Sequence, residues 1–201
     1  MRLRTQAGPQ ALGRNSEGDV RAGNTGEVMV SEFLPPYAQG VLDGNVYSAA
    51  NQAAQAVSVA LATTYTGLLV YNPIGSGVIL IPRLVKFALS VAPAAIASIG
   101  LISGVQSAAP TGLTALNVRN NQIGNAGSGK GLAYSAATIA TPIWQQQLVD
   151  GFTAAALPAP SPLVDLKGDV VLLPGAFLAI GALTAVTGLG SISWQETPLN
   201  S

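Results

Sequence analysis

One loop of the sequence has the residue types of a nucleotide-binding site. Residues 124–131 (GNAGSGKG) fit the pattern G-x-x-x-x-G-K, in which backbone N–H groups and a lysine hold phosphate. The pattern ends in Gly131, where such a loop needs a Ser or Thr hydroxyl for Mg²⁺. A phosphate loop also lies between a buried strand and a helix. Here polar residues 120–122 precede the loop and the strand-like run 135–141 follows it, so we expect a surface loop without nucleotide.

Other candidates for catalysis are few. The chain has no His and no Cys, which excludes thiol nucleophiles, Ser-His-Asp triads and the usual zinc ligands. The one close pair of acids in the expected fold is Asp165 with Asp169, and Lys167-Gly168 between them indicates a turn. We therefore predict a protein that is not an enzyme and has no catalytic, cofactor-binding or metal site.

The composition is poor in charge. Nine basic and nine acidic residues make up 9% of the 201 residues, whereas soluble domains average about 25%. A net charge of zero gives no electrostatic reason to expect nucleic acid or an anionic membrane as a partner. Such a surface suits a protein packed among neighbours, and a secreted or array protein with a neutral polar surface is the alternative.

Several long segments have no charge, but Pro, Gly, Asn and Gln interrupt them, and we expect no membrane span. The first eight residues are basic and lead into no apolar segment, so we expect no secretory signal there.

The elements that must position any site are predicted to be strands. In residues 71–91, Pro73 and three glycine or serine residues make a reversal, and apolar residues then alternate with others from Val85 to Val91. Pro82-Arg83 interrupts this run, which indicates a bulge, a bend or a sheet edge. Further runs predict strands over 27–31, 56–61, 68–71, 95–103, 113–119, 170–173, 176–183 and 191–196, with a weaker one over 47–51.

Residues 142–157 allow two readings. Trp144, Leu148 and Phe152 have helical spacing after Pro142, whereas Asp150-Gly151 is a hairpin signal. We favour strands on either side of Asp150-Gly151. Residues 157–162 are expected to be an extended connection. The spacing of all these runs is typical of an all-β sandwich.

Residues 1–25 are expected to form a flexible N-terminal arm, and residues 26–201 the sandwich domain. The arm has almost no large apolar residue. It could dock on an acidic neighbour, and a solvated tail is the alternative. Its candidate interaction residues are Arg2, Arg4, Arg14 and Arg21.

Four aromatic residues are predicted to anchor the core: Phe87, Trp144, Phe177 and Trp194. For the two tryptophans the alternative is a surface platform on which a sugar stacks. In the last strand, Ile192, Trp194 and Glu196 are expected to share one face.

Three segments resemble a known family: residues 69–77, 173–181 and 190–198. They are similar to segments of small virion proteins of tailed bacteriophages, of the cement or decoration type, and the likeness covers roughly residues 26–198. The resemblance implies a jelly-roll sandwich with an extended arm that binds the outside of an icosahedral capsid. It also implies the major capsid protein and further copies of the chain, as a dimer or trimer, as partners. The alternative is a virion adhesin or head-fibre module that binds a receptor glycan through exposed Tyr and Trp.

Overall fold

The structure is a computed structural model that describes residues 37–59, 61–152 and 163–199. Its regular elements are one short helix, α1 (Ala38–Leu42), and twelve strands. The strands are β1 (Val46–Ala50), β2 (Gln55–Val57), β3 (Thr64–Tyr71), β4 (Val78–Leu89), β5 (Ala97–Val105), β6 (Thr111–Leu116), β7 (Arg119–Asn120), β8 (Leu132–Thr138), β9 (Ile143–Phe152), β10 (Leu163–Asp165), β11 (Ala176–Ala182) and β12 (Val186–Pro198). None of the described residues forms a helix long and apolar enough to cross a lipid bilayer.

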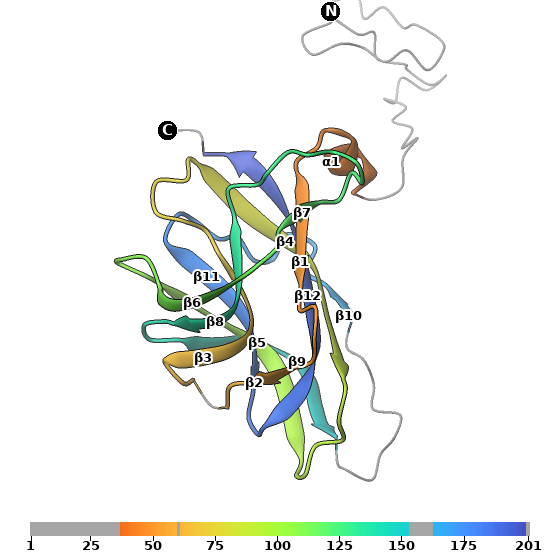
Figure 1. The fold of residues 1–201 in the computed structure, drawn as a ribbon, viewed down its shortest axis with the longest axis vertical. Helices are drawn as coiled ribbons and strands as arrows, with labels where there is room; N and C mark the ends of the chain where they lie inside the picture. The colour runs from red at the N-terminus through yellow and green to blue at the C-terminus, as the bar shows by residue number, and fades with distance from the viewer. Residues whose placement is uncertain (1–36, 60, 153–162, 200–201) are drawn as a thin grey trace, which may run out of the picture. The chain divides into compact units, whose positions relative to one another are not determined.

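The strands form two antiparallel sheets of six strands each. The first sheet has the order β10-β4-β12-β1-β7, with β2 paired to the start of β12. The second sheet has the order β6-β8-β3-β11-β5-β9. Figure 1 shows the two sheets face to face, with β4, β1 and β12 on one side and β11, β3 and β8 on the other. This arrangement confirms the predicted all-β sandwich.

The order of eight of these strands is that of a jelly roll. In chain order they are β1, β3, β4, β5, β9, β10, β11 and β12. The first sheet has β1, β12, β4 and β10 side by side, which are the first, eighth, third and sixth strands of this series. The second sheet has β3, β11, β5 and β9 side by side, which are the second, seventh, fourth and fifth. Successive strands of the series therefore change sheet at every step except from β5 to β9, which pair with each other, as in two interlocked Greek keys.

Three strands are added to this jelly roll between β5 and β9. Of these, β7 pairs with β1 in the first sheet, whereas β8 pairs with β3 in the second sheet and carries β6 on its other side. The insertion thus extends both sheets beyond β1 and β3. It also contains the glycine-rich loop of residues 121–131.

The main core lies between the sheets. Trp194, Phe87 and Leu68 are fully or almost fully buried there, as are the inward residues of β5 and β11. Trp194, Ile192 and Glu196 alternate with more exposed residues along β12, so the predicted shared face is present. A single amide joins the two layers: Asn51 Nδ2 donates to Gly67 O on β3, and Asn51 Oδ1 accepts from Gly190 N on β12.

A second buried cluster lies on the outer face of the second sheet. It includes Tyr65, Tyr71 and Phe177, each at most 2% exposed. The connection from β8 to β9 packs against this face, because Ile139 belongs to the cluster and Ala140 N donates to Gln106 Oε1. Phe177 is therefore buried as expected, but against the outside of its sheet and not between the sheets.

The predicted reversal after β3 is stabilised by one buried side chain. Asn72 Nδ2 donates to Val78 O and Leu172 O, and Asn72 Oδ1 accepts from Ser76 Oγ. Gly75 and Gly77 have φ values of +75° and +72°, which glycine adopts without strain. Downstream, the register of β4 with β12 shifts, because Ser193 lies opposite Leu84 and Trp194 lies opposite Pro82, so no residue of β12 lies opposite Arg83. This confirms the bulge, one of the three alternatives predicted at Pro82-Arg83.

Several local predictions were wrong. β9 runs through Asp150-Gly151 without a hairpin, and residues 143–152 are not helical, because this segment pairs along β5. The strand expected over 56–61 ends at Val57, and residues 170–173 form only an isolated bridge between Leu172 and Leu80. The arm, the strand predicted over 27–31 and the connection predicted over 157–162 lie outside the described residues.

Trp144 does not anchor the core. It lies at the surface of β9 with 37% of its area exposed, and its benzene ring rests over Gly100 and Gly181. These glycines are paired across β5 and β11, and a Cβ on either would meet the ring at 2.9 to 3.2 Å. The two missing side chains therefore create the space that the indole occupies on the outside of the sheet.

Candidate functional site

The glycine-rich loop binds an anion, and that anion is a side chain of the protein itself. Glu196 on β12 is only 9% exposed, and its carboxylate accepts hydrogen bonds from three N–H groups. Lys130 N donates to Oε2 at 2.8 Å, Gly131 N donates to Oε1 at 2.8 Å, and Trp194 Nε1 donates to Oε1 at 3.2 Å. The N–H groups of Lys130 and Gly131, at the end of the phosphate-loop pattern, are therefore already used by Glu196.

The close approach of the loop depends on its glycines. A Cβ at Gly129 would lie 2.6 Å from Glu196 Oε1, and a Cβ at Gly131 would lie 2.9 Å from Trp194 Nε1. Tyr47 lies beside the same carboxylate. Burial raises the pKa of Tyr47 above its ordinary value, and the negative charge of Glu196 raises it further, whereas a hydrogen bond with Asn120 acts in the opposite direction.

The acidic pair forms a turn. Asp165 Oδ1 accepts from Lys167 N at 3.0 Å, and Asp169 N donates to Leu166 O. Lys167 and Gly168 both have positive φ values, as the chain reverses there. Among the described residues, no group of three or more His, Cys, Asp or Glu side chains is close enough to hold a metal ion.

One end of the sandwich exposes apolar side chains. Three connections meet there: β2 to β3, β4 to β5, and β11 to β12. Their contact is direct, because Val59 forms a bridge with Ala182, Leu183 N donates to Ser98 O, and Thr184 Oγ1 donates to Ile96 O. The exposed residues of this apolar end are Val59 (40%), Leu61 (39%), Val91 (62%), Ile96 (63%) and Leu183 (51%).

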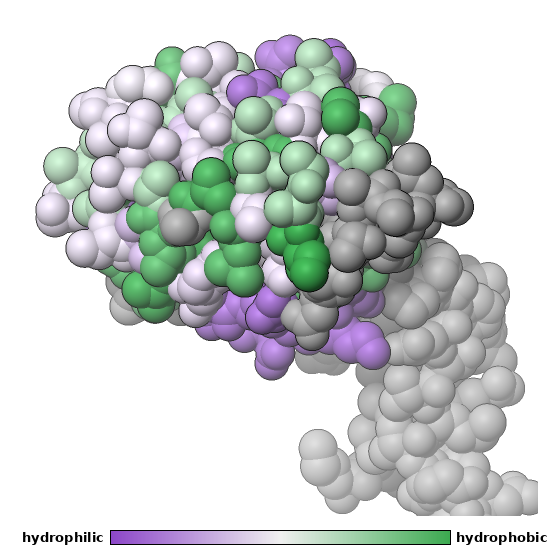
Figure 2. All heavy atoms as spheres, turned by 90° about the horizontal axis from the view of Figure 1, so that it is seen from below, coloured by the Kyte–Doolittle hydropathy of each residue, from purple (hydrophilic) through white to green (hydrophobic). Residues whose placement is uncertain are grey.

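The apolar end has no charged residue in any of its three described connections, residues 58–59 with 61–63, 90–96 and 183–185. Figure 2 looks onto this end, where hydrophobic and near-neutral residues cover most of the surface and hydrophilic ones gather at two borders. Exposed apolar residues that cluster in this way mark surfaces that bind other molecules, whereas scattered ones need no explanation. This end is therefore a candidate docking surface.

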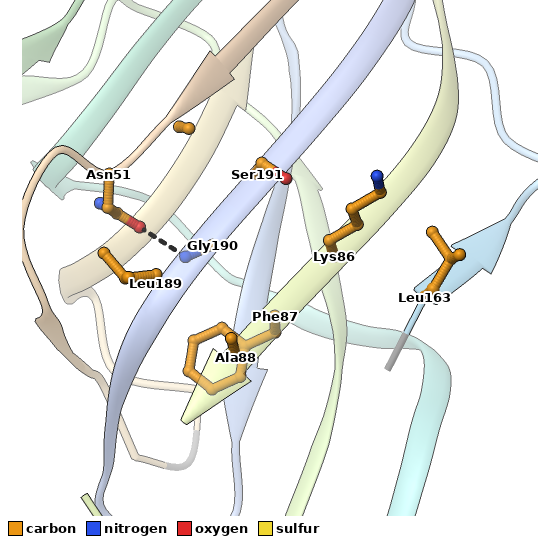
Figure 3. Close-up of a pocket in the computed structure, with 9 residues that line it drawn as sticks. Asn51, Lys86, Phe87, Ala88, Leu163, Leu189, Gly190 and Ser191 are labelled. Carbon is orange, nitrogen blue, oxygen red and sulfur yellow. Dashed lines mark hydrogen bonds between the residues drawn. The ribbon is translucent and has the colours of Figure 1, made fainter. Parts of the chain in front are cut away.

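The outer face of the first sheet has two adjoining hollows. The larger has a volume of about 370 Å³ and lies over β4, β12 and the end of β1, and the smaller has about 260 Å³. Ala50, Lys86 and Ser191 line both. Figure 3 shows Lys86 between Ser191 and Leu163, with its side chain directed away from the core. We call the two hollows together the Lys86 groove.

Comparisons of the chain with protein-family models, with curated proteins and with solved structures found no match.

The residues predicted for a site are only partly covered by the structure. Arg2, Arg4, Arg14 and Arg21 lie outside the described residues. Phe87 and Trp194 lie in the main core and Phe177 in the outer cluster, so they are structural. Sequence reasoning missed the apolar end, although the signal was present: the uncharged runs 44–82, 87–118 and 170–195 supply its three connections.

Proposed function

We propose that this chain is a non-enzymatic structural protein that packs against other protein chains through its apolar end. The observation that carries the proposal is the cluster of Val91, Ile96 and Leu183 on connections without charge. Removing exposed apolar surface from water gains roughly 25 cal/mol of free energy per Å², so a partner that covers these side chains is bound more favourably. The absence of charge at this end removes the electrostatic repulsion that would oppose contact between identical copies.

The specific form of the proposal is a capsid cement or decoration protein of a tailed bacteriophage. Its partners are then the major capsid protein and further copies of the chain, and its location is the outer surface of the virion. The support is the resemblance of residues 69–77, 173–181 and 190–198, together with the jelly-roll strand order, which is common among viral capsid proteins but also occurs in lectin domains and cupins.

A charge substitution at the apolar end tests the assembly role. Ile96→Asp should lower the association of the purified chain, measured by sedimentation velocity at several concentrations, because the carboxylate must lose its hydration in the contact. Ile123→Asp is the matched control, since Ile123 is 91% exposed in the β7–β8 loop, outside the apolar end. A wild-type chain that remains monomeric at all concentrations, alone and with shells, would contradict the proposal.

A separate measurement tests the assignment to a virion. Mass analysis of purified particles should find this chain in a fixed ratio to the shell protein, and particles from which the chain is absent would refute the assignment.

A virion adhesin is the second candidate function, and Trp144 is the observation that favours it. The indole is partly exposed on the outer face of the second sheet, where a sugar ring could stack on it. Binding of the purified chain to a glycan array, lost in Trp144→Ala, would support this candidate over the cement role.

A further inference from the structure

The ammonium group of Lys86 lies where the two hollows of the Lys86 groove adjoin. Lys86 is the one charged residue among the described residues that line either hollow. Its ammonium group makes no hydrogen bond or ion pair with any of the described residues. The neighbouring carboxylate, that of Asp165, is on β10 opposite Leu84 and accepts a hydrogen bond from Lys167 N. Within the described part of the chain Lys86 thus has no partner, and its charge can pair with another group.

The two halves of the groove differ in chemistry. The larger hollow is almost entirely apolar, and Leu163 and Leu189, which are 61% and 43% exposed, form its walls. The smaller hollow carries the hydroxyls of Ser48 and Ser193 and the amide of Asn121. Along the outer face the groove thus presents an apolar hollow, then a cation shared by both halves, then hydrogen-bonding groups.

We propose that the Lys86 groove binds an acidic segment of a partner protein. An apolar side chain of that segment fills the hollow between Leu163 and Leu189. The carboxylate of the adjoining Asp or Glu pairs with the Lys86 ammonium, and the polar backbone that follows faces Ser48 and Asn121. The inference rests on the proposed role as an assembly protein, because it names the chemistry of a partner, but it uses a surface separate from the apolar end.

The lining of the groove favours a peptide over an acidic sugar. Sugar sites commonly stack the ring on an aromatic side chain, and the one aromatic residue that lines the groove, Phe87, is 2% exposed. The exposed walls are leucines, which suit an aliphatic or aromatic side chain of a peptide. The single ammonium group of Lys86, beside these leucines, can pair with one carboxylate of the peptide.

The test uses two blocked peptides and NMR spectroscopy of the full chain. The first peptide is acetyl-Gly-Leu-Asp-Gly amide, and the second has Asn in place of Asp. The Asp peptide should shift the amide signals of the groove strands β4 and β12, with an affinity about five-fold higher than that of the Asn peptide. Lys86→Met keeps the aliphatic stem and should remove this difference. Lys130→Met is the matched control, because Lys130 is another exposed lysine, and should leave the difference unchanged.

Other outcomes would overturn the proposal. Equal affinity for the Asp and Asn peptides, or no groove signals that shift at millimolar Asp peptide, would show that Lys86 does not select an acid. Stronger and Lys86-dependent shifts with glucuronic acid would assign the groove to an acidic sugar. Sedimentation of Lys86→Met separates this result from the assembly role, since self-association through the apolar end should not change.

Discussion

The contact between Glu196 and the glycine-rich loop leads to a quantitative prediction for stability. Replacing Glu196 with Ala removes the acceptor for Lys130 N, Gly131 N and Trp194 Nε1. Two of these donors, Gly131 N and Trp194 Nε1, form buried hydrogen bonds, so water does not easily replace the carboxylate. The third, Lys130 N, is only partly buried and is easier to hydrate.

The magnitude follows from those two buried donors. A buried donor left without a partner costs about 1–3 kcal/mol, so Glu196→Ala should lower the free energy of unfolding by about 2–6 kcal/mol. Glu196→Gln keeps a carbonyl oxygen for Gly131 N and Trp194 Nε1, but it places an NH₂ group near Lys130 N. Its cost should be about 1–2 kcal/mol.

Urea unfolding followed by far-ultraviolet circular dichroism measures these differences without relying on the fluorescence of Trp194, which the substitutions themselves alter. Lys130→Ala is the matched control. It removes an exposed side chain but keeps the backbone N–H that donates to Glu196, so stability should stay within about 0.5 kcal/mol of the wild type. A Glu196→Ala variant as stable as this control, with an unchanged slope against urea, would refute the reasoning. A melting temperature that ATP raises in a Lys130-dependent way would contradict our interpretation of the loop.

Three further predictions follow from burial, ionisation and the arm. Trp194→Ala should cost about 3–5 kcal/mol in urea unfolding, because Trp194 is fully buried, and Trp144→Ala should cost clearly less; equal costs would contradict the assignment of Trp144 to the surface. Burial raises the pKa of Tyr65, so the unfolded chain loses its phenolic proton first as the pH rises through about 10, and the folded state loses stability above that pH. Absorbance should show the last tyrosinate forming only as circular dichroism reports unfolding, and complete tyrosine ionisation in a folded chain would exclude this. Deleting residues 1–25 should leave the melting temperature similar but lower the occupancy on shells, and the difference from the full-length chain should be largest at low salt, where the ion pairs of the arm are least screened. Equal occupancy of the truncated and full-length chains at both low and high salt would show that the arm does not contribute.

The strands with one face in the core were predictable from sequence. In β4 and β12, inward apolar residues alternate with exposed or small ones over many positions, and Pro82 marked the bulge. Short-range turn signals were less informative. Asp150-Gly151 has the composition of a hairpin turn, but pairing of β9 with β5 keeps the backbone extended there. In such cases tertiary contacts outweigh local preference.

The candidate sites depend on contacts that sequence patterns do not show. Trp144 was assigned to the core because the chain has few other aromatic residues to fill one, but the space that it occupies is made by glycines on β5 and β11. Glu196 and Gly131 are 65 residues apart, and nothing in either local pattern connects them. The uncharged runs were visible, but only the strand order of the jelly roll brings their turns to one end.

The short strands at the borders of the first sheet bear on how such a protein avoids aggregation. Unpaired backbone groups on a sheet border can recruit another strand, and a surface with few charges has little repulsion to prevent it. In the first sheet, as far as the described residues show, β7 has two residues and β10 has three, so neither offers a long template there. In the second sheet the border strands β6 and β9 are longer. The register of β6 with β8 shifts at two places and that of β9 with β5 at three, and such bulges twist a border strand away from a regular partner. Growth by strand addition at these borders is therefore disfavoured, even though the chain has few charged residues to oppose it by repulsion.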